Sequence, residues 1–305
     1  MSKLSIIFAI LILSLNICSQ SAGDLNRRGL ERHARGDYDG AIADFTAAIE
    51  LSSRLKTNKS ELINNLSADE AILLDRVTVI DPRTAISLVN RGNTYFAKSD
   101  LSSAIDDFSR AIDIRPGFAE AYTGRATAWL IKKDLDRAAA DYEKAVKLDS
   151  NFTRAYVGRG MVRLDRGETQ AALEDFDYAV RLEPKNAQMY YHRGDARRIS
   201  RDEAGALEDF EFAIKLDPRL PAPYVGRGTV RFYRRDFDAA IRDFTRALEL
   251  NGRYAEAYKN RGYAYFVLGR EAEAEKDLDQ ALTLAPRYQT EIETNLKIIK
   301  SWKKT

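Results

Sequence analysis

Residues 221–254 read PAPYVGRGTVRFYRRDFDAAIRDFTRALELNGRY, and the same pattern returns one fixed step before and after, at 187–220 and 255–288. Two alanines of this unit, Ala240 and Ala247, flank Phe244 at spacings typical of one face of a helix. The same position of each unit holds Arg, at Arg91, Arg125, Arg159, Arg193, Arg227 and Arg261. This stretch therefore predicts a fold built from internal repeats.

Each repeat predicts two helices joined by a turn. The alanine and aromatic columns define one face of the second helix, and small residues there indicate close helix contact. Proline or a substitute ends most units, where it is expected to stop that helix, at Pro116, Ser150, Pro184, Pro218, Gly252 and Pro286. A further copy lies upstream around Arg28, Gly36 and Phe45, which gives seven units.

One break interrupts the repeat period. The step from Arg28 to Arg91 is longer than the step from Arg91 to Arg125, because an extra segment, 56–84, follows the first repeat. Within it, Ser67 to Glu70 spells a capping box ahead of an apolar run, which predicts the start of a short helix. We expect this segment to fill the gap between repeats, and a partner-binding loop is the alternative.

Composition limits the classes of protein that remain. The chain has 305 residues, 45% of them hydrophobic and 31% charged, which is typical of a folded protein and too long for one compact core. The net charge of +2 gives no general field that would attract nucleic acid or anionic lipid. Cys18 is the only cysteine, so neither a disulfide nor a thiolate metal site is expected.

The N-terminus resembles a secretory signal. Lys3 precedes an apolar run from Leu4 to Ile17 and then small or polar residues, and this run is shorter than a membrane-spanning helix requires. We therefore expect residues 1–21 to be a signal peptide, with an uncleaved anchor as the alternative. The protein would then be exported, to the periplasm or the extracytoplasmic side of the membrane.

The unit has a length of roughly 34 residues, an early Gly, two alanines, an aromatic and a terminal Pro, and it resembles the tetratricopeptide repeat. Tyrosines stand where this family often has Trp, at Tyr122, Tyr156, Tyr190, Tyr224 and Tyr258. The resemblance implies an all-α, right-handed superhelical solenoid of antiparallel helix pairs. Its units would be 22–55, 85–118, 119–152, 153–186, 187–220, 221–254 and 255–288, followed by a capping helix, 289–305.

The same resemblance implies that first helices line a concave, partner-binding face. The groove residues carried over to this chain are Val89, Asn93, Thr123, Thr127, Val157, Met161, Tyr191, Asp195, Val225, Thr229, Lys259 and Tyr263. Arg198 belongs to the same face, whereas Leu130, Leu164 and Phe232 could equally be helix packing. Such a groove would suit a peptide or helix with hydrophobic anchors. A clamp for a terminal carboxylate is not expected, because Lys259 and Asn260 stand alone.

A second column pairs with the arginines. An Asp follows each Arg at one constant spacing, at Asp44, Asp107, Asp141, Asp175, Asp209, Asp243 and Asp277. A guanidinium and a carboxylate that pair in a bidentate manner relieve the cost of burying either alone. We therefore predict a repeated Arg–Asp ladder with a structural role, and solvated surface charges are the alternative.

These patterns favour a non-catalytic scaffold for protein partners. His33 and His192 lie in different repeats and are expected to be surface residues, so no metal, cofactor, small-molecule substrate or catalytic base is predicted. The alternative is a self-associating structural protein of the envelope, and homo-oligomers are compatible with the sequence. A nucleic-acid reader is disfavoured by the near-neutral charge.

Overall fold

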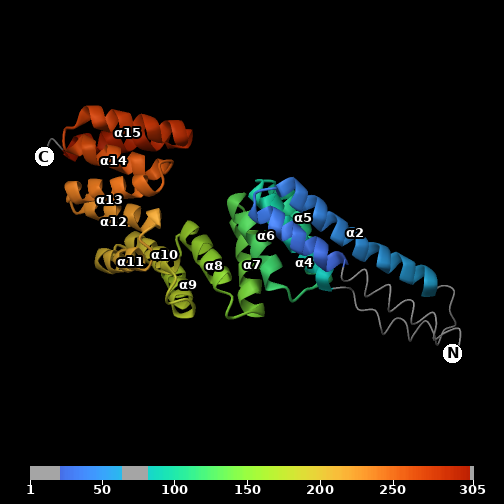
Figure 1. Cartoon of the computed structure of the whole chain (residues 1–305). Coiled ribbons are helices and arrows are strands. Elements are labelled where there is room, and N and C mark those ends of the chain that lie inside the picture. Colours follow the sequence, from blue (N-terminus) through green and yellow to red (C-terminus); the bar gives the residue numbers. More distant parts are fainter. Residues whose placement is uncertain (1–20, 64–81, 303–305) are drawn as a thin grey trace. The chain divides into compact units, whose positions relative to one another are not determined.

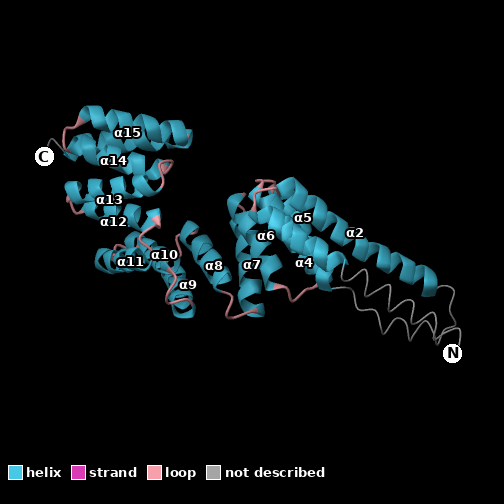
Figure 2. Cartoon of the chain, viewed as in Figure 1, coloured by secondary structure: helices cyan, strands magenta, loops and turns pink. Residues whose placement is uncertain are grey.

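The computed structural model describes residues 21–63 and 82–302, with side chains for 21–53 and 83–300, and these residues are helical with short turns between helices (Figure 1, Figure 2). A helix over 21–34 precedes α2 (Tyr38–Ile63). Further helices follow in pairs: α4 (Pro82–Ala97) and α5 (Leu101–Ile114), α6 (Ala119–Ile131) and α7 (Leu135–Leu148), α8 (Thr153–Asp165) and α9 (Thr169–Leu182), α10 (Ala187–Ile199) and α11 (Glu203–Leu216), α12 (Pro221–Tyr233) and α13 (Phe237–Leu250), α14 (Ala255–Val267) and α15 (Glu271–Leu284). A short 3-10 helix, η1 (Pro286–Tyr288), leads into α16 (Gln289–Trp302).

The all-helical prediction is confirmed, because the described residues contain no strand and adjacent helices pack in pairs, as in a helical solenoid. The chain divides into two compact units, one up to Val162 and one from Arg163 onward. The signal peptide and the capping box at Ser67 to Glu70 fall outside the described residues. No described helix combines the length and apolar character needed to cross a membrane.

The turn within each repeat has a recurring local cause. The second residue after the first helix adopts a left-handed backbone conformation, for example Arg235 at φ 65° and Gly269 at φ 75°, which ends the helix. In several repeats an Asp follows directly and caps the second helix. The side chain of Asp236 accepts a hydrogen bond from the amide of Ala239, and Asp100, Asp134 and Asp202 act in the same way.

The aromatic column of the second helices forms the centre of each repeat. Phe210 is fully buried, and its ring occupies the space beside Gly194 of its own repeat and Gly226 of the next. A Cβ atom built at these two glycines would lie 2.9 and 2.5 Å from ring carbons of Phe210. The alanine columns are also fully buried, so small residues on both helices allow the ring to lie close to the backbone.

The first two repeats stack directly despite the extra segment between them. Arg91 donates to the hydroxyl of Thr46 at 2.9 Å, and His33 Nδ1 lies 3.0 Å from Thr94 Oγ1. The next repeat shows the same contact without an extra segment, because Arg125 donates to Ser109 at 3.1 Å. The first two repeats are therefore in direct contact, and the role of the extra segment stays a prediction, because residues 64–81 lie outside the described part of the chain. α2 also continues to Ile63, beyond the expected end of the first unit at residue 55.

The last helix covers the end of the array. Ile292 and Ile299 of α16 are buried in one hydrophobic cluster with Tyr263, Leu278 and their neighbours. This is the packing expected of a terminal capping helix, because it removes the apolar face of the seventh repeat from water.

Candidate partner-binding cavity and the arginine network

A cavity of about 450 Å³ lies within the C-terminal unit. Its walls come mainly from the first helices of the fifth, sixth and seventh repeats, α10, α12 and α14, and from the capping helix α16. The stacking of one first helix per repeat therefore brings side chains from three successive repeats into one site.

The structure brings six of the twelve predicted groove residues together in this cavity. They are Tyr191, Asp195, Val225, Thr229, Lys259 and Tyr263. Arg198 and Phe232 also line it, although Phe232 and Val225 are largely buried and contribute mainly to packing. These six residues are part of the lining that α10, α12 and α14 contribute, and their role in binding a partner stays a prediction.

The other six predicted groove residues lie in the N-terminal unit and have diverse environments. Val89 belongs to the hydrophobic core with Phe108, and Thr123 is buried with no hydrogen-bond partner for its hydroxyl among the described residues. Thr127 is half-buried beside the hydroxyl of Tyr142, at 2.9 Å. The remaining three differ in exposure, with Val157 half-buried and Asn93 and Met161 exposed. Val89 is therefore a core residue, contrary to the groove position that we expected.

Both cationic side chains of the cavity are already paired. Arg198 donates to Asp195 through Nε at 2.9 Å and Nη2 at 2.6 Å. Lys259, which is buried, donates to Glu291 of α16 at 2.6 Å, and its ammonium lies 4.3 Å from the centre of the Tyr288 ring. These pairs compensate the desolvation of both cations, so the cavity has no free cation among its lining residues.

A third carboxylate, that of Glu256, remains without such a partner. Glu256 is half-buried in the cavity wall, and within the described part of the chain its carboxylate has no hydrogen bond or ion pair. Burial raises the pKa of Glu256. The charges of Asp195 and Glu291 act in the same direction, and those of Lys259 and Arg198 lower the pKa. The ionised lining residues are three acids and two bases, so the cavity carries one excess negative charge when Glu256 is ionised.

Neutral polar groups complete the lining. Asn260 donates to the hydroxyl of Thr229 at 3.2 Å, and Asn295 of α16 donates to the hydroxyl of Tyr263 at 3.3 Å. Burial raises the pKa of Tyr263 to about 12, so this phenol stays a neutral hydrogen-bonding group. Asn260 keeps unused donor and acceptor capacity toward the cavity, which is suited to a peptide backbone.

Glu256 and the residues of α16 were not predicted to line the groove, and Asn260 was considered only as part of a carboxylate clamp. Glu256 and Asn260 flank the predicted Lys259, but their columns vary between repeats and gave no signal. Glu291 and Asn295 were missed because α16 was assigned only a capping role. A wider reading of non-repeating polar residues in the seventh repeat could have identified Glu256 and Asn260.

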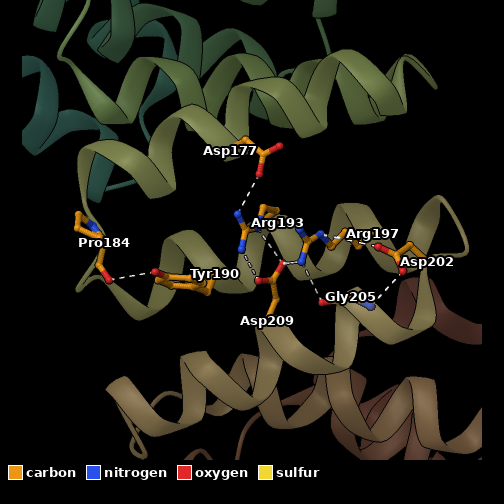
Figure 3. Close-up of polar contacts among 8 residues, drawn as sticks. All are labelled: Asp177, Pro184, Tyr190, Arg193, Arg197, Asp202, Gly205 and Asp209. Carbon is orange, nitrogen blue, oxygen red and sulfur yellow. Dashed lines mark hydrogen bonds and ion pairs between the residues drawn. The ribbon is translucent and has the colours of Figure 1, made fainter.

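The arginine column forms bidentate ion pairs in the described repeats. Arg193 donates to Asp209 through Nε at 3.0 Å and Nη2 at 2.6 Å (Figure 3). The same arrangement joins Arg28 to Asp44, Arg91 to Asp107, Arg125 to Asp141, Arg227 to Asp243 and Arg261 to Asp277. The Asp side chains are buried, so the alternative of solvated surface charges is wrong for these repeats.

The fourth repeat is an exception, because the division between the two compact units falls within it. Arg159 and Asp175 belong to different units, so their pairing stays a prediction, and Arg163 lies 2.8 Å from Asp175. In three other repeats, the residue equivalent to Arg163 is also an Arg and forms an ion pair with the Asp of its repeat, as Arg197 does with Asp209 (Figure 3). This second pairing was not predicted.

Most arginines of the column also contact an aromatic ring and the preceding repeat, namely Arg91, Arg125, Arg193, Arg227 and Arg261. Tyr190 donates to the carbonyl of Pro184 (Figure 3), at 3.1 Å, and the guanidinium of Arg193 lies 5.5 Å from the centre of the Tyr190 ring. Arg193 also donates to Asp177 of the preceding repeat at 2.9 Å. One guanidinium therefore links both helices of its own repeat to the repeat before it.

The two histidines are not the incidental surface residues that we expected. His33 is half-buried against Thr94, and His192 stacks on Phe176 with ring centres 5.8 Å apart. His192 occupies the column in which Gly158 and Gly226 contact the preceding aromatic ring. Burial lowers the pKa of His192.

The described residues contain no cluster of His, Cys, Asp and Glu suited to a metal ion.

Comparison with known proteins identifies the class. A family model described as the tetratricopeptide repeat matches residues 89–151, 157–221 and 225–288, which is more than half of the chain. The protein therefore belongs to the tetratricopeptide repeat family. Members of this family are generally non-catalytic scaffolds for interactions between proteins. Among the curated proteins, none matches this sequence.

Solved structures share the fold. A tetratricopeptide repeat protein from Parabacteroides merdae ATCC 43184 is similar with a TM-score of 0.66 and 17% identity, over 92% of this chain and 99% of that chain. PilF of Pseudomonas aeruginosa gives 0.56 and 19% identity, over 66% of this chain and 92% of its own. A thermophilic tetratricopeptide repeat protein of Thermus thermophilus gives 0.53 and 18%, over 60% and 99%.

Proposed function

We propose that this protein is a non-catalytic adaptor that binds a peptide segment of a partner protein in the cavity of its C-terminal unit. The observation that carries this proposal is the convergence of α10, α12, α14 and α16 on one 450 Å³ cavity. Its lining combines aromatic rings with amide and carboxylate groups, a mixture suited to anchoring side chains and pairing with a peptide backbone. We further propose that the protein acts in the cell envelope, on the basis of the signal-like residues 1–21.

The surface exposure of Tyr233 provides a test of the cavity. Tyr233 lines the cavity and is 62% exposed, so its removal should leave the packing of α12 intact. Phe212 of α11 is 41% exposed and lies outside the cavity, which makes Phe212→Ala a matched control. Short random-sequence peptides displayed on phage would be selected on the full chain, and the dissociation constants of the selected peptides measured for each variant.

Aromatic anchors at the centre of an interface often contribute about 2 kcal/mol. We therefore expect Tyr233→Ala to weaken peptide binding by roughly thirtyfold and Phe212→Ala to leave it unchanged. Peptides whose affinity depends on Phe212 but not on Tyr233 would place binding elsewhere. Failure to select any peptide, together with a mass that grows with concentration in light scattering, would favour the self-associating structural protein instead.

A further inference from the structure

The cavity contains an imbalance of charge that a ligand could correct. Asp195 pairs with Arg198 and Glu291 pairs with Lys259, so two acids and two bases compensate one another. Glu256 is the remaining Asp, Glu, Lys or Arg residue of the lining, and no described residue donates a hydrogen bond to it. An ionised carboxylate away from bulk water is costly unless it is paired.

The same geometry argues against an anionic ligand. The ammonium of Lys259 is buried between Glu291 and the Tyr288 ring, and the guanidinium of Arg198 forks onto Asp195. An incoming carboxylate would have to break one of these pairs and would also face Glu256. An incoming cation would instead add a missing partner and leave both existing pairs intact.

Aromatic rings line the same cavity as Glu256. Tyr191 and Tyr263 come from α10 and α14, and Tyr233 ends α12. Flat aromatic faces stabilise a cation or the methylene stem of a long basic side chain. The cavity volume of about 450 Å³ is large enough for such a side chain together with part of its backbone.

We propose that the cavity binds a basic side chain, lysine or arginine, of the bound peptide, with Glu256 as the carboxylate that pairs with it and the tyrosine rings as its walls. This inference rests on the proposed function, because it names the chemistry of the peptide that the cavity takes. Asn260 is placed beside Lys259 to bond the backbone of the same peptide through its unused amide groups.

The experiment starts from the peptides selected on the full chain. Each basic residue of a selected peptide is replaced in turn by an uncharged analogue, norleucine for lysine or citrulline for arginine. Dissociation constants are then measured by calorimetry for the parent, for Glu256→Gln and for Glu275→Gln. Glu275 is an exposed carboxylate of α15 outside the cavity, so this variant controls for the general loss of one negative charge.

We expect one basic residue to dominate, with its neutral analogue binding the parent about tenfold more weakly. The same replacement should have little effect on Glu256→Gln, and Glu275→Gln should behave as the parent, because the two charges act as a coupled pair. Circular dichroism and unfolding midpoints of each variant show that the fold is retained.

Two results would overturn the inference while leaving peptide binding in place. One is a set of selected peptides without a basic residue, and the other is a neutral analogue that loses the same affinity on Glu256→Gln as on the parent. A failure to select any peptide is a different result, because it removes the proposed function and this inference together.

Discussion

Arg261 and Asp277 join the two helices of the seventh repeat through a pair of parallel hydrogen bonds, from Nε to Oδ2 at 2.6 Å and from Nη2 to Oδ1 at 2.9 Å. Asp277 has this one basic partner among the described residues, whereas Asp209 of the fifth repeat is paired with both Arg193 and Arg197. The position of the second Arg is Tyr265 in the seventh repeat. The repeats therefore differ in the number of Arg side chains that pair with the buried Asp.

This difference predicts unequal effects of the same substitution. Arg261→Met leaves the buried Asp277 without a cation and should lower the free energy of unfolding by about 3 to 5 kcal/mol. Arg193→Met leaves Asp209 with Arg197 and should cost clearly less. Urea unfolding followed by circular dichroism measures both variants, and equal losses would show that the second Arg does not support its Asp.

Removing both partners tests the structural role of the ladder itself. The double variant Arg261→Met with Asp277→Leu eliminates the unpaired buried carboxylate, so we expect it to be clearly more stable than Arg261→Met alone. The same unfolding measurement decides the matter. Small and equal losses in the single and double variants would mean that the pair contributes nothing beyond surface charge.

The contact between Gly226 and the Phe210 ring predicts a steric limit. A methyl group at Gly226 would lie 2.5 Å from ring carbons of the fully buried Phe210, so Gly226→Ala should destabilise the protein by roughly 1 to 3 kcal/mol. Gly252 is a control in an inter-repeat turn, where an added Cβ would lie 3.8 Å from the nearest atom. Gly252→Ala is expected to change the unfolding midpoint little, and a harmless Gly226→Ala would refute the close approach.

Glu256 predicts a conflict between stability and binding. Its pKa is raised in the folded state, so the stability it contributes is present below the ordinary pKa of 4.5 and is lost as pH rises through the folded value. Glu256→Gln should therefore be more stable than the parent at pH 7 and equal to it below about pH 4.5. Unfolding free energies at both pH values measure this, and a variant that is less stable at pH 7 would contradict it.

His192 predicts a loss of stability in mild acid. Burial lowers its pKa below 6.5, so the stability from the neutral ring is present above that pH and is lost as pH falls through the folded value. His192→Phe keeps an aromatic ring against Phe176 and should weaken this dependence. Unfolding midpoints compared between pH 8 and pH 5 provide the measurement, and parallel curves for parent and variant would contradict the prediction.

The repeat period predicts the helices and the cores because a column such as Phe210, Phe244 and their alanine neighbours reports local packing that every unit shares. It also predicts the pairs such as Arg193 with Asp209, because both partners lie within one unit. The cavity was only partly predicted, since Glu256, Asn260 and Glu291 do not follow the period. A site formed by residues that differ between repeats cannot be found from the residues that the repeats share.

The burial of Val89 has a related cause. The family pattern places it on the inner face, but the pattern does not say how deeply a small apolar side chain sinks between neighbouring helices. In this chain Val89 packs in one cluster with Phe108. The position of a residue on a helix therefore predicts the direction of its side chain better than it predicts how exposed that side chain is.

The hydrogen bond between Arg91 and Thr46 has a consequence for the length of the connection between the first two repeats. Neighbouring repeats contact each other through side chains on their helices. The number of residues that connect them therefore affects stability only through the entropic cost of closing a loop, which increases slowly with length. We therefore expect the register of the first two repeats to depend on these helix contacts and not on the length of the connection, so that a reporter or a second domain inserted there would leave both repeats in place.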